Sequence, residues 1–265
     1  MKISVFTSMT DPESRNDPYN EALSCYGDLA DEVIIVGENW PTEFKFDHIG
    51  KTFHEGFEKS TGDWAIRMDL DYFFHENDLI KIKKFLQINN DSPAVAFPQY
   101  QFFTQERYHV KTKLCIALNK KRFPEIKING GGDMCQPTID NKQILHTMVP
   151  NLNVPIWQYD SMFRTKEIIA KDRARFARAW FKQFNDWGDR GGGIEDEAFN
   201  AWYKMIEDRY KKHVLRTNIS HHPKYIQDKL RNLNENQFGY NAFGLKGSTK
   251  RSFYDYVKGY KERYS

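Results

Sequence analysis

Hydrophobic and polar positions follow a strand–helix–strand order at the start of the chain. Residues 3–7 (ISVFT) are rich in β-forming side chains, and the stretch after them is full of turn formers. Residues 18–30 have helical spacing with a proline near the start, and residues 31–37 (DEVIIVG) form an apolar run typical of a buried parallel strand. This order predicts a βαβ unit with a right-handed crossover.

The same order then repeats. Residues 50–60 place Phe53 and Phe57 four positions apart, on one face of a predicted helix. Residues 63–74 (DWAIRMDLDYFF) predict a third strand that carries two acids, and residues 77–88 predict a helix. The apolar stripe of that helix comprises Leu79, Ile82 and Leu86.

Residues 94–103 and 108–120 are two β-type runs around a short turn, which predicts an antiparallel hairpin. Together these elements predict an α/β fold with a mixed sheet flanked by helices. We expect a nucleotide-binding half over residues 1–125 and an acceptor half with helices over residues 126–265, within one compact domain. We also expect a mobile loop at 129–137 (NGGGDMCQP).

The second half predicts two further helices, over residues 166–184 and 194–212, joined by the glycine-rich loop 188–193. In the first, an aromatic-rich face is expected to turn inward: Ile169, Phe176, Trp180 and Phe184. In the second, the inward residues are Ala198, Trp202 and Met205. Aromatic residues of the tail fit core packing or base stacking: Tyr240, Phe243, Phe253, Tyr254, Tyr256 and Tyr260.

Composition narrows the class of protein. The 265 residues are 40% hydrophobic and 15% aromatic, which excludes a disordered chain. No apolar run approaches the length of a membrane helix, so we expect a protein that binds no membrane. Three widely spaced cysteines suit reduced thiols, so we expect a cytoplasmic protein (in the host cytoplasm for a viral chain).

The net charge of +3 hides an asymmetry between the two halves of the chain. Residues 1–110 hold 10 Lys and Arg against 19 Asp and Glu, and the remainder hold 29 against 17. Either surface charge drifts along the chain, or the basic half contacts an anionic partner.

The strongest chemical signal is Asp69-Leu70-Asp71 at the end of the third predicted strand. Side chains two apart on a strand point the same way, so both carboxylates would meet at the carboxyl edge of the sheet, where α/β proteins bind ligands. Two like charges so close call for a cation between them. Oxygen ligands favour Mg²⁺ or Mn²⁺.

The segments ALSCYGDLADEVIIVG and GKTFHEGFEKSTGDWAIRMDLDYFF resemble the nucleotide-sugar-binding half of GT-A glycosyltransferases of the family-2 type, over residues 3–80. The resemblance implies a nucleotide-sugar donor, with a UDP-sugar as the expected one, bound through a metal on Asp69 and Asp71. It assigns further residues to the donor site: Thr7, Ser8, Glu38, Lys51 and Arg67.

Glu195-Asp196, at the start of a predicted helix, resembles the E-D motif of the same families, whose acid is the general base. Asp196 is the preferred base and Glu195 the second choice, because a carboxylate there could take the proton of an acceptor hydroxyl. Ordinary acids of a helix N-terminus are the alternative. The Q-x-x-R-W motif that often follows is absent, which argues against a processive polysaccharide synthase.

His221-His222-Pro223 is similar to a late histidine of GT-A enzymes that completes the metal shell, and His222 is the preferred ligand. A turn histidine is the alternative. The stretch 157–164 is similar to one that borders the acceptor pocket in such enzymes. It contributes Trp157, Tyr159, Asp160 and Arg164 as acceptor residues.

The predicted helix 166–184 carries a basic stripe that could neutralise phosphates or simply face solvent. The stripe comprises Lys171, Arg175, Arg178 and Lys182, and Arg175 and Arg178 join the acceptor residues.

The leading hypothesis is a metal-dependent, inverting glycosyltransferase. Its acceptor is either a glycan, lipid or small molecule, or a hydroxymethylated pyrimidine in DNA, as in viral DNA hypermodification. A nucleotidyltransferase also uses paired acids, although the loop after the first strand lacks glycine. A non-catalytic nucleic-acid-binding module is the third alternative.

Overall fold

The computed structural model describes residues 1–131, 135–212 and 215–244. The chain forms two compact units, which are described separately: Met1–Gln99 with Thr112–Trp157, and Tyr100–Lys111 with Gln158–Ser265. This division differs from the boundary expected at residue 125, because residues 126–157 belong to the first unit.

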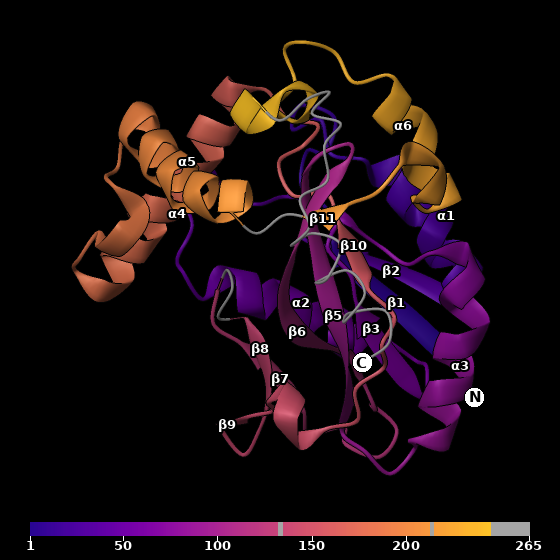
Figure 1. Ribbon diagram of the computed structural model, residues 1–265. Coiled ribbons are helices and arrows are strands. Elements are labelled where there is room, and N and C mark those ends of the chain that lie inside the picture. Colours follow the sequence, from indigo (N-terminus) through magenta and orange to yellow (C-terminus); the bar gives the residue numbers. More distant parts are fainter. Residues whose placement is uncertain (132–134, 213–214, 245–265) are drawn as a thin grey trace. The chain divides into compact units, whose positions relative to one another are not determined.

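The first unit is built on a mixed sheet with the strand order β2-β1-β3-β6-β5-β10-β4 (Figure 1). Its strands are β1 (Ile3–Ser8), β2 (Glu32–Val36), β3 (Trp64–Arg67), β4 (Tyr72–Phe73), β5 (Ala94–Thr104), β6 (Arg107–Leu118) and β10 (Ile156–Gln158). Strand β1 pairs in parallel with β2 and β3, and β3 pairs antiparallel with β6. The predicted mixed α/β sheet with flanking helices is thereby confirmed, including the hairpin of β5 and β6.

Strand β2 is less buried than its apolar sequence suggested. It lies at the edge of the sheet, beside β1 alone, and Ile35 is 36% exposed. A continuous apolar run therefore marks a strand here but not a fully covered one.

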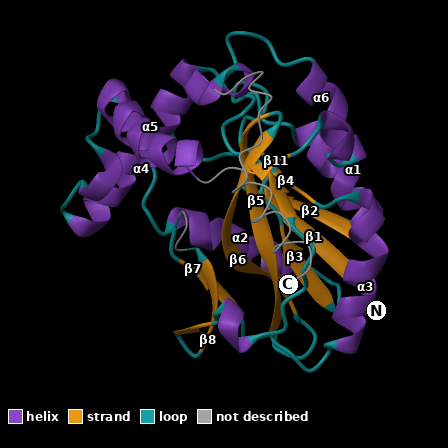
Figure 2. Ribbon diagram, viewed as in Figure 1, coloured by secondary structure: helices purple, strands orange, loops and turns teal. Residues whose placement is uncertain are grey.

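Helices of this unit cover the sheet where the hydrophobic spacing placed them: α1 (Tyr19–Leu29), α2 (His48–Lys59) and α3 (Leu79–Ile88) (Figure 2). The crossover from β1 to β2 and the one from β2 to β3 run in opposite directions, so right-handed connections place α1 and α2 on opposite faces. Phe53 and Phe57 of α2 pack edge-on against Phe6, with ring centroids 6.5 Å apart. Gly56 lets the helix approach, since a Cβ there would lie 2.7 Å from the Phe6 ring.

The two ends of the segment 129–137, which was expected to be a mobile loop, belong to a small three-stranded sheet. It comprises β7 (Lys127–Asn129), β8 (Gln136–Ile139) and β9 (Lys142–Gln143), in that order. Gly50 of α2 donates its N–H to the carbonyl of Gly130 at 2.9 Å. Residues 132–134 of the predicted loop lie outside the described residues.

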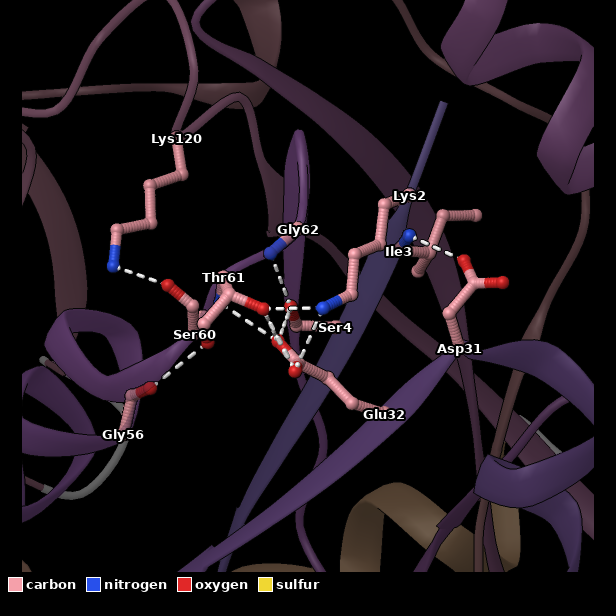
Figure 3. A network of polar contacts seen from close by, with 10 residues as sticks. All are labelled: Lys2, Ile3, Ser4, Asp31, Glu32, Gly56, Ser60, Thr61, Gly62 and Lys120. Atoms are coloured by element: carbon pink, nitrogen blue, oxygen red, sulfur yellow. Dashed lines mark hydrogen bonds and ion pairs between the residues drawn. The ribbon is translucent and has the colours of Figure 1, made fainter.

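A polar network joins the amino ends of β1 and β2 to the segment between α2 and β3 (Figure 3). The Glu32 carboxylate accepts hydrogen bonds from the Ser4 hydroxyl, from the Thr61 N–H at 2.7 Å and from the Lys2 ammonium at 3.1 Å. Partial burial opposes the charge, but these hydrogen bonds outweigh it and lower the pKa of Glu32 to about 2. The Ser4 hydroxyl in turn accepts the Gly62 N–H at 2.7 Å.

The second unit contains the far half of the β5–β6 hairpin, with β11 (Leu215–Arg216) paired to β6, and the helices α4 (Lys166–Phe184), α5 (Glu195–Lys212) and α6 (Gln227–Arg231). Its core gathers Phe103, Ile169, Trp202, Ile206, Tyr210 and Phe243. A helical C-terminal region is thus confirmed. Residues 245–265, with Phe253, Tyr254, Tyr256 and Tyr260, lie outside the described residues.

The inward faces of α4 and α5 agree with those expected only in part, since Ile169, Ala198 and Trp202 are buried. Helix α4 buries an alanine-rich face, while Phe184 is 43% exposed. Its Ala174 and Ala177 pack with Ala198 of α5, because small side chains let two helices approach closely. On α5, Ile206 is buried and Met205 is 43% exposed.

Among the described residues, no helix is long and apolar enough to cross a membrane.

Candidate functional site

The carboxyl ends of β1, β2 and β3 lie side by side at one edge of the first unit's sheet. The connections leaving β1 and β3 run in opposite directions along the sheet, which is where open α/β sheets bind ligands. Thr7 and Ser8 end β1, Glu38 follows β2 as an exposed turn residue, and Arg67 ends β3. Four of the predicted donor residues therefore belong to this edge, which we call the donor edge.

A glycine shapes the turn between β2 and Glu38. Gly37 has φ +70°, and a Cβ there would lie 2.5 Å from Trp40 Nε1 and 2.7 Å from Ser8 Oγ. Only glycine fits this close approach without strain. The backbone conformation and the close neighbours therefore require glycine at position 37, directly before Glu38.

Asp69 and Asp71 lie at the donor edge, but not on a strand. Strand β3 ends at Arg67, and the two acids belong to a turn closed by the Tyr72 N–H, which donates to the Asp69 carbonyl at 2.8 Å. The expected strand alternation therefore does not orient their side chains. We call Asp69–Tyr72 the acid turn.

Arg67 organises the acidic side of the donor edge. Its Nη2 donates to Asp69 Oδ2 at 3.1 Å, its Nη1 donates to the Cys135 carbonyl at 2.7 Å, and its guanidinium lies 4.3 Å from the centre of the Phe53 ring. Burial opposes the charge, but the Asp69 carboxylate outweighs it and raises the pKa of Arg67 above its usual value. Arg67 is therefore a permanent cation beside the paired acids.

Two buried polar atoms at the donor edge have no hydrogen-bond partner among the described residues: Thr7 Oγ1 and Arg67 Nε. Thr7 is fully buried, and the Arg67 side chain is 15% exposed. Buried donors and acceptors are rarely left unsatisfied in folded proteins. Their position suits a site that a polar ligand completes.

The paired acids have the right chemistry for a hard divalent cation, since carboxylate oxygens are the ligands that Mg²⁺ and Mn²⁺ take. Among the described residues, no group of three or more His, Cys, Asp or Glu side chains could hold a metal ion. In their chemistry, the carboxylates of Asp69 and Asp71 fit such a cation.

Lys51 lies in the first turn of α2, where its Nζ pairs with Asp47 Oδ2 at 2.6 Å. This ion pair lowers the pKa of the Asp47 carboxyl. The Lys51 side chain is 73% exposed, so it remains accessible.

In the second unit, Glu195 and Asp196 occupy the first turn of α5, as the sequence predicted, and both are exposed. They follow a 3₁₀ turn at Gly188–Arg190, the glycines Gly191–Gly193 and one further residue, Ile194. A carboxylate at this position is stabilised by the helix dipole.

His222 does not offer a nitrogen to a metal in this structure. It is fully buried, its Nδ1 lies 2.8 Å from the Tyr159 hydroxyl, and its Nε2 lies 2.8 Å from the Gln105 carbonyl. A carbonyl only accepts, so Nε2 carries a proton and donates to the Gln105 carbonyl, while Nδ1 shares a hydrogen bond with the Tyr159 hydroxyl. The expected metal contact of His222 stays a prediction, and in this structure His222 and Tyr159 are both fully buried and contact each other.

Other predicted acceptor residues also make internal contacts. Asp160 accepts hydrogen bonds from Gln101 at 2.8 Å and from Ser161 at 2.8 Å, and it pairs with Arg173 at 3.3 Å. Arg164 pairs with Asp172 at 3.0 Å. These contacts connect the second unit's elements.

The remaining predicted acceptor residues are largely enclosed as well. Arg178 donates to the Gly193 carbonyl at 2.6 Å, and Arg175 is half-buried. Trp157, in the first unit, is 9% exposed, with its ring 6.1 Å from that of His75. On the basic stripe, Lys171 and Lys182 are exposed.

Sequence reasoning missed Tyr26, which contacts the acid turn from α1. Its hydroxyl donates to the Asp69 carbonyl at 2.6 Å, across 43 residues of sequence. Burial, the neighbouring Cys25 and the two acids raise the pKa of Tyr26 well above its usual value, so it remains a donor. The helical pattern of residues 18–30 predicted only a buried ring for Tyr26, and no motif in the sequence predicted a hydrogen bond from its hydroxyl.

No protein-family model matches the chain, and no curated protein matches it. Among solved structures it is similar to TarS 1–349 of S. aureus in complex with UDP-GlcNAc, with a TM-score of 0.37, 12% identity, and coverage of 78% of this chain and 80% of that one. The complex of the same protein with UDP gives a TM-score of 0.35, 10% identity, and 78% and 80% coverage. A longer TarS structure gives 0.36 at 9% identity, covering 80% of this chain and 44% of that one.

Proposed function

We propose that this protein is a nucleotide-sugar-dependent glycosyltransferase that uses a divalent cation, Mn²⁺ or Mg²⁺, and transfers with inversion to an acceptor hydroxyl. The observation that carries the proposal is the donor edge. A permanent cation, two carboxylates and two unsatisfied buried polar atoms belong to this edge, where the connections that leave β1 and β3 diverge. A nucleoside diphosphate carries the negative charge and the polar groups that these residues could bind.

Each side chain of the donor edge has a role that follows from its chemistry. Asp69 and Asp71 would hold the cation, which when bound stabilises negative charge on the departing diphosphate. Arg67 adds a fixed positive charge beside them, and Thr7, Ser8 and Glu38 line the side on which a nucleoside would bind. A UDP-sugar is the donor to test first.

Transfer needs a base as well as a leaving group. In the proposed reaction the acceptor oxygen bonds to the anomeric carbon while the bond from that carbon to the phosphate oxygen breaks. The hydroxyl proton passes to Asp196, with Glu195 as the alternative base. Both carboxylates are exposed in the first turn of α5, where an acceptor hydroxyl can reach them.

The decisive experiment incubates the protein with a panel of nucleotide sugars and Mn²⁺ and follows the products by mass spectrometry. We expect a nucleoside diphosphate to be released from one donor, and we expect Asp71→Asn and chelation each to abolish the release. Asp91→Asn is the matched control, because that carboxylate is 88% exposed and pairs only at the surface with Arg122.

Two outcomes would contradict the proposal. Release of pyrophosphate from nucleoside triphosphates would instead identify a nucleotidyltransferase. Full turnover by Asp71→Asn with every active donor would show that the acid turn is not the site.

The acceptor class is a separate part of the proposal. Lys171 and Lys182 are exposed on α4 and could contact phosphates, so we propose DNA with hydroxymethylated pyrimidines as one acceptor to test. A glycan, lipid or small molecule is the alternative acceptor, and the dependence of acceptor binding on salt separates the two.

A further inference from the structure

The backbone of the acid turn is held by a single side chain from α1. Tyr26 is fully buried, and its hydroxyl lies 2.6 Å from the Asp69 carbonyl and 3.2 Å from the Tyr72 carbonyl. These are the first and last residues of the turn. One hydroxyl therefore spans the segment that contains both acids.

The neighbouring residue of α1 extends this contact along the chain. Cys25 Sγ donates to the Phe74 carbonyl at 3.5 Å, and Cys25 is fully buried. Helix α1 thus contacts the backbone at both ends of the acid turn and two residues beyond it. Without the Tyr26 hydroxyl, the Asp69 carbonyl would keep the Tyr72 N–H as a donor but would lose its contact with α1.

Tyr26 and Arg67 constrain different parts of the same residue. Arg67 holds the Asp69 carboxylate, whereas Tyr26 holds the Asp69 carbonyl. The two contacts come from opposite faces of the sheet, since Arg67 stacks on Phe53 of α2 and Tyr26 belongs to α1. Asp69 is therefore fixed in backbone and in side chain, as a preorganised ligand requires.

We propose that Tyr26 is a positioning residue, whose hydroxyl holds the acid turn in the conformation that binds the divalent cation. The proposal rests on the function proposed above. Tyr26 acts through the backbone, and it touches neither the cation nor the donor.

The test uses Tyr26→Phe, which keeps the buried ring and removes only the hydroxyl. Binding of Mn²⁺ alone is followed by the electron paramagnetic resonance signal of the free ion. We expect a five- to tenfold weaker affinity, about the effect of one lost hydrogen bond on the bound conformation. In assays with the donor, the Mn²⁺ concentration for half-maximal activity should rise by the same factor, while kcat at saturating Mn²⁺ stays within about twofold.

Tyr210→Phe is the matched control. Tyr210 is equally enclosed, and its hydroxyl also contacts two backbone groups, the Phe103 N–H and the Arg107 carbonyl, but in the second unit. We expect a comparable loss of stability and unchanged Mn²⁺ affinity. Replacing Tyr26 by 4-aminophenylalanine, which keeps a donor at the same ring position, should restore the affinity.

The outcomes separate this proposal from the proposed function. Wild-type affinity in Tyr26→Phe, or weak affinity that 4-aminophenylalanine does not restore, would overturn the positioning role and leave the cation site intact. If the wild type and Asp71→Asn bound Mn²⁺ equally, the acid turn would hold no cation, and the cation site and the positioning role would both be wrong.

Discussion

Acid should weaken the first unit through Glu32. Its carboxylate has a folded-state pKa of about 2, against an ordinary value of 4.5. Because the folded pKa is the lower one, the unfolded chain binds the proton more readily. The stabilisation is therefore complete above pH 4.5 and is lost as the pH falls toward 2.

The size of the effect follows from the same two values. The difference corresponds to at most about 3.4 kcal/mol, at 1.36 kcal/mol for each unit of pKa. A quarter of the Glu32 side chain is exposed, and solvent screening reduces the expected contribution to about 2 kcal/mol. Glu32→Gln should remove this contribution at neutral pH, because an amide cannot accept all of the donors that converge there.

Urea unfolding followed by circular dichroism measures the difference between the wild type and Glu32→Gln. We expect about 2 kcal/mol from pH 7 to pH 4.5, and a steady decrease below that. Glu55→Gln is the control, since Glu55 is half exposed and pairs with Lys59 on the surface of α2; its effect should stay below about 0.5 kcal/mol at every pH. A difference that stayed constant down to pH 3, or one no larger than that of Glu55→Gln, would refute the reasoning.

Three further measurements test other parts of the molecule. Asp196→Asn should lower kcat by about 10²- to 10⁴-fold with little change in donor affinity, and a parallel loss of donor affinity would instead place Asp196 in the donor site. The double change of Lys171 and Lys182 to alanine should flatten the salt dependence of DNA binding by up to about two units while sparing donor hydrolysis, and no DNA affinity at low salt would exclude a DNA acceptor. Gly56→Ala should destabilise the protein by about 1–3 kcal/mol in thermal unfolding, because its Cβ would meet the Phe6 ring; an unchanged or higher Tm would show that helix propensity outweighs the clash.

Local patterns in the sequence were sufficient where packing followed periodicity. Leu79, Ile82 and Leu86 are the buried residues of α3, as their spacing predicted. On α4 the spacing allowed two inward faces, one aromatic and one alanine-rich. The contact with α5 selects the alanine face, and that choice depends on a partner helix that periodicity does not describe.

The candidate site shows the same limit. The sequence placed Asp69 and Asp71 after a strand at the carboxyl edge, but it could not show that the strand stops at Arg67. Contacts between residues distant in sequence hold the acid turn and His222 in place. The Tyr26 hydroxyl contacts the acid turn at Asp69, 43 residues away, and the Gln105 carbonyl contacts His222, 117 residues away. Such contacts leave no local signature.

The two ends of the parallel strands differ in what a substitution would cost. At the amino ends, Glu32, Ser4 and Thr61 are tied to one another, so a change at one of them is felt by all. At the carboxyl ends, Glu38 is exposed in a turn that needs glycine at position 37. Substitutions at Glu38 should therefore be tolerated by the fold, whereas those at Glu32, Ser4 or Thr61 should not. The two ends of the same strands therefore differ in their tolerance to substitution.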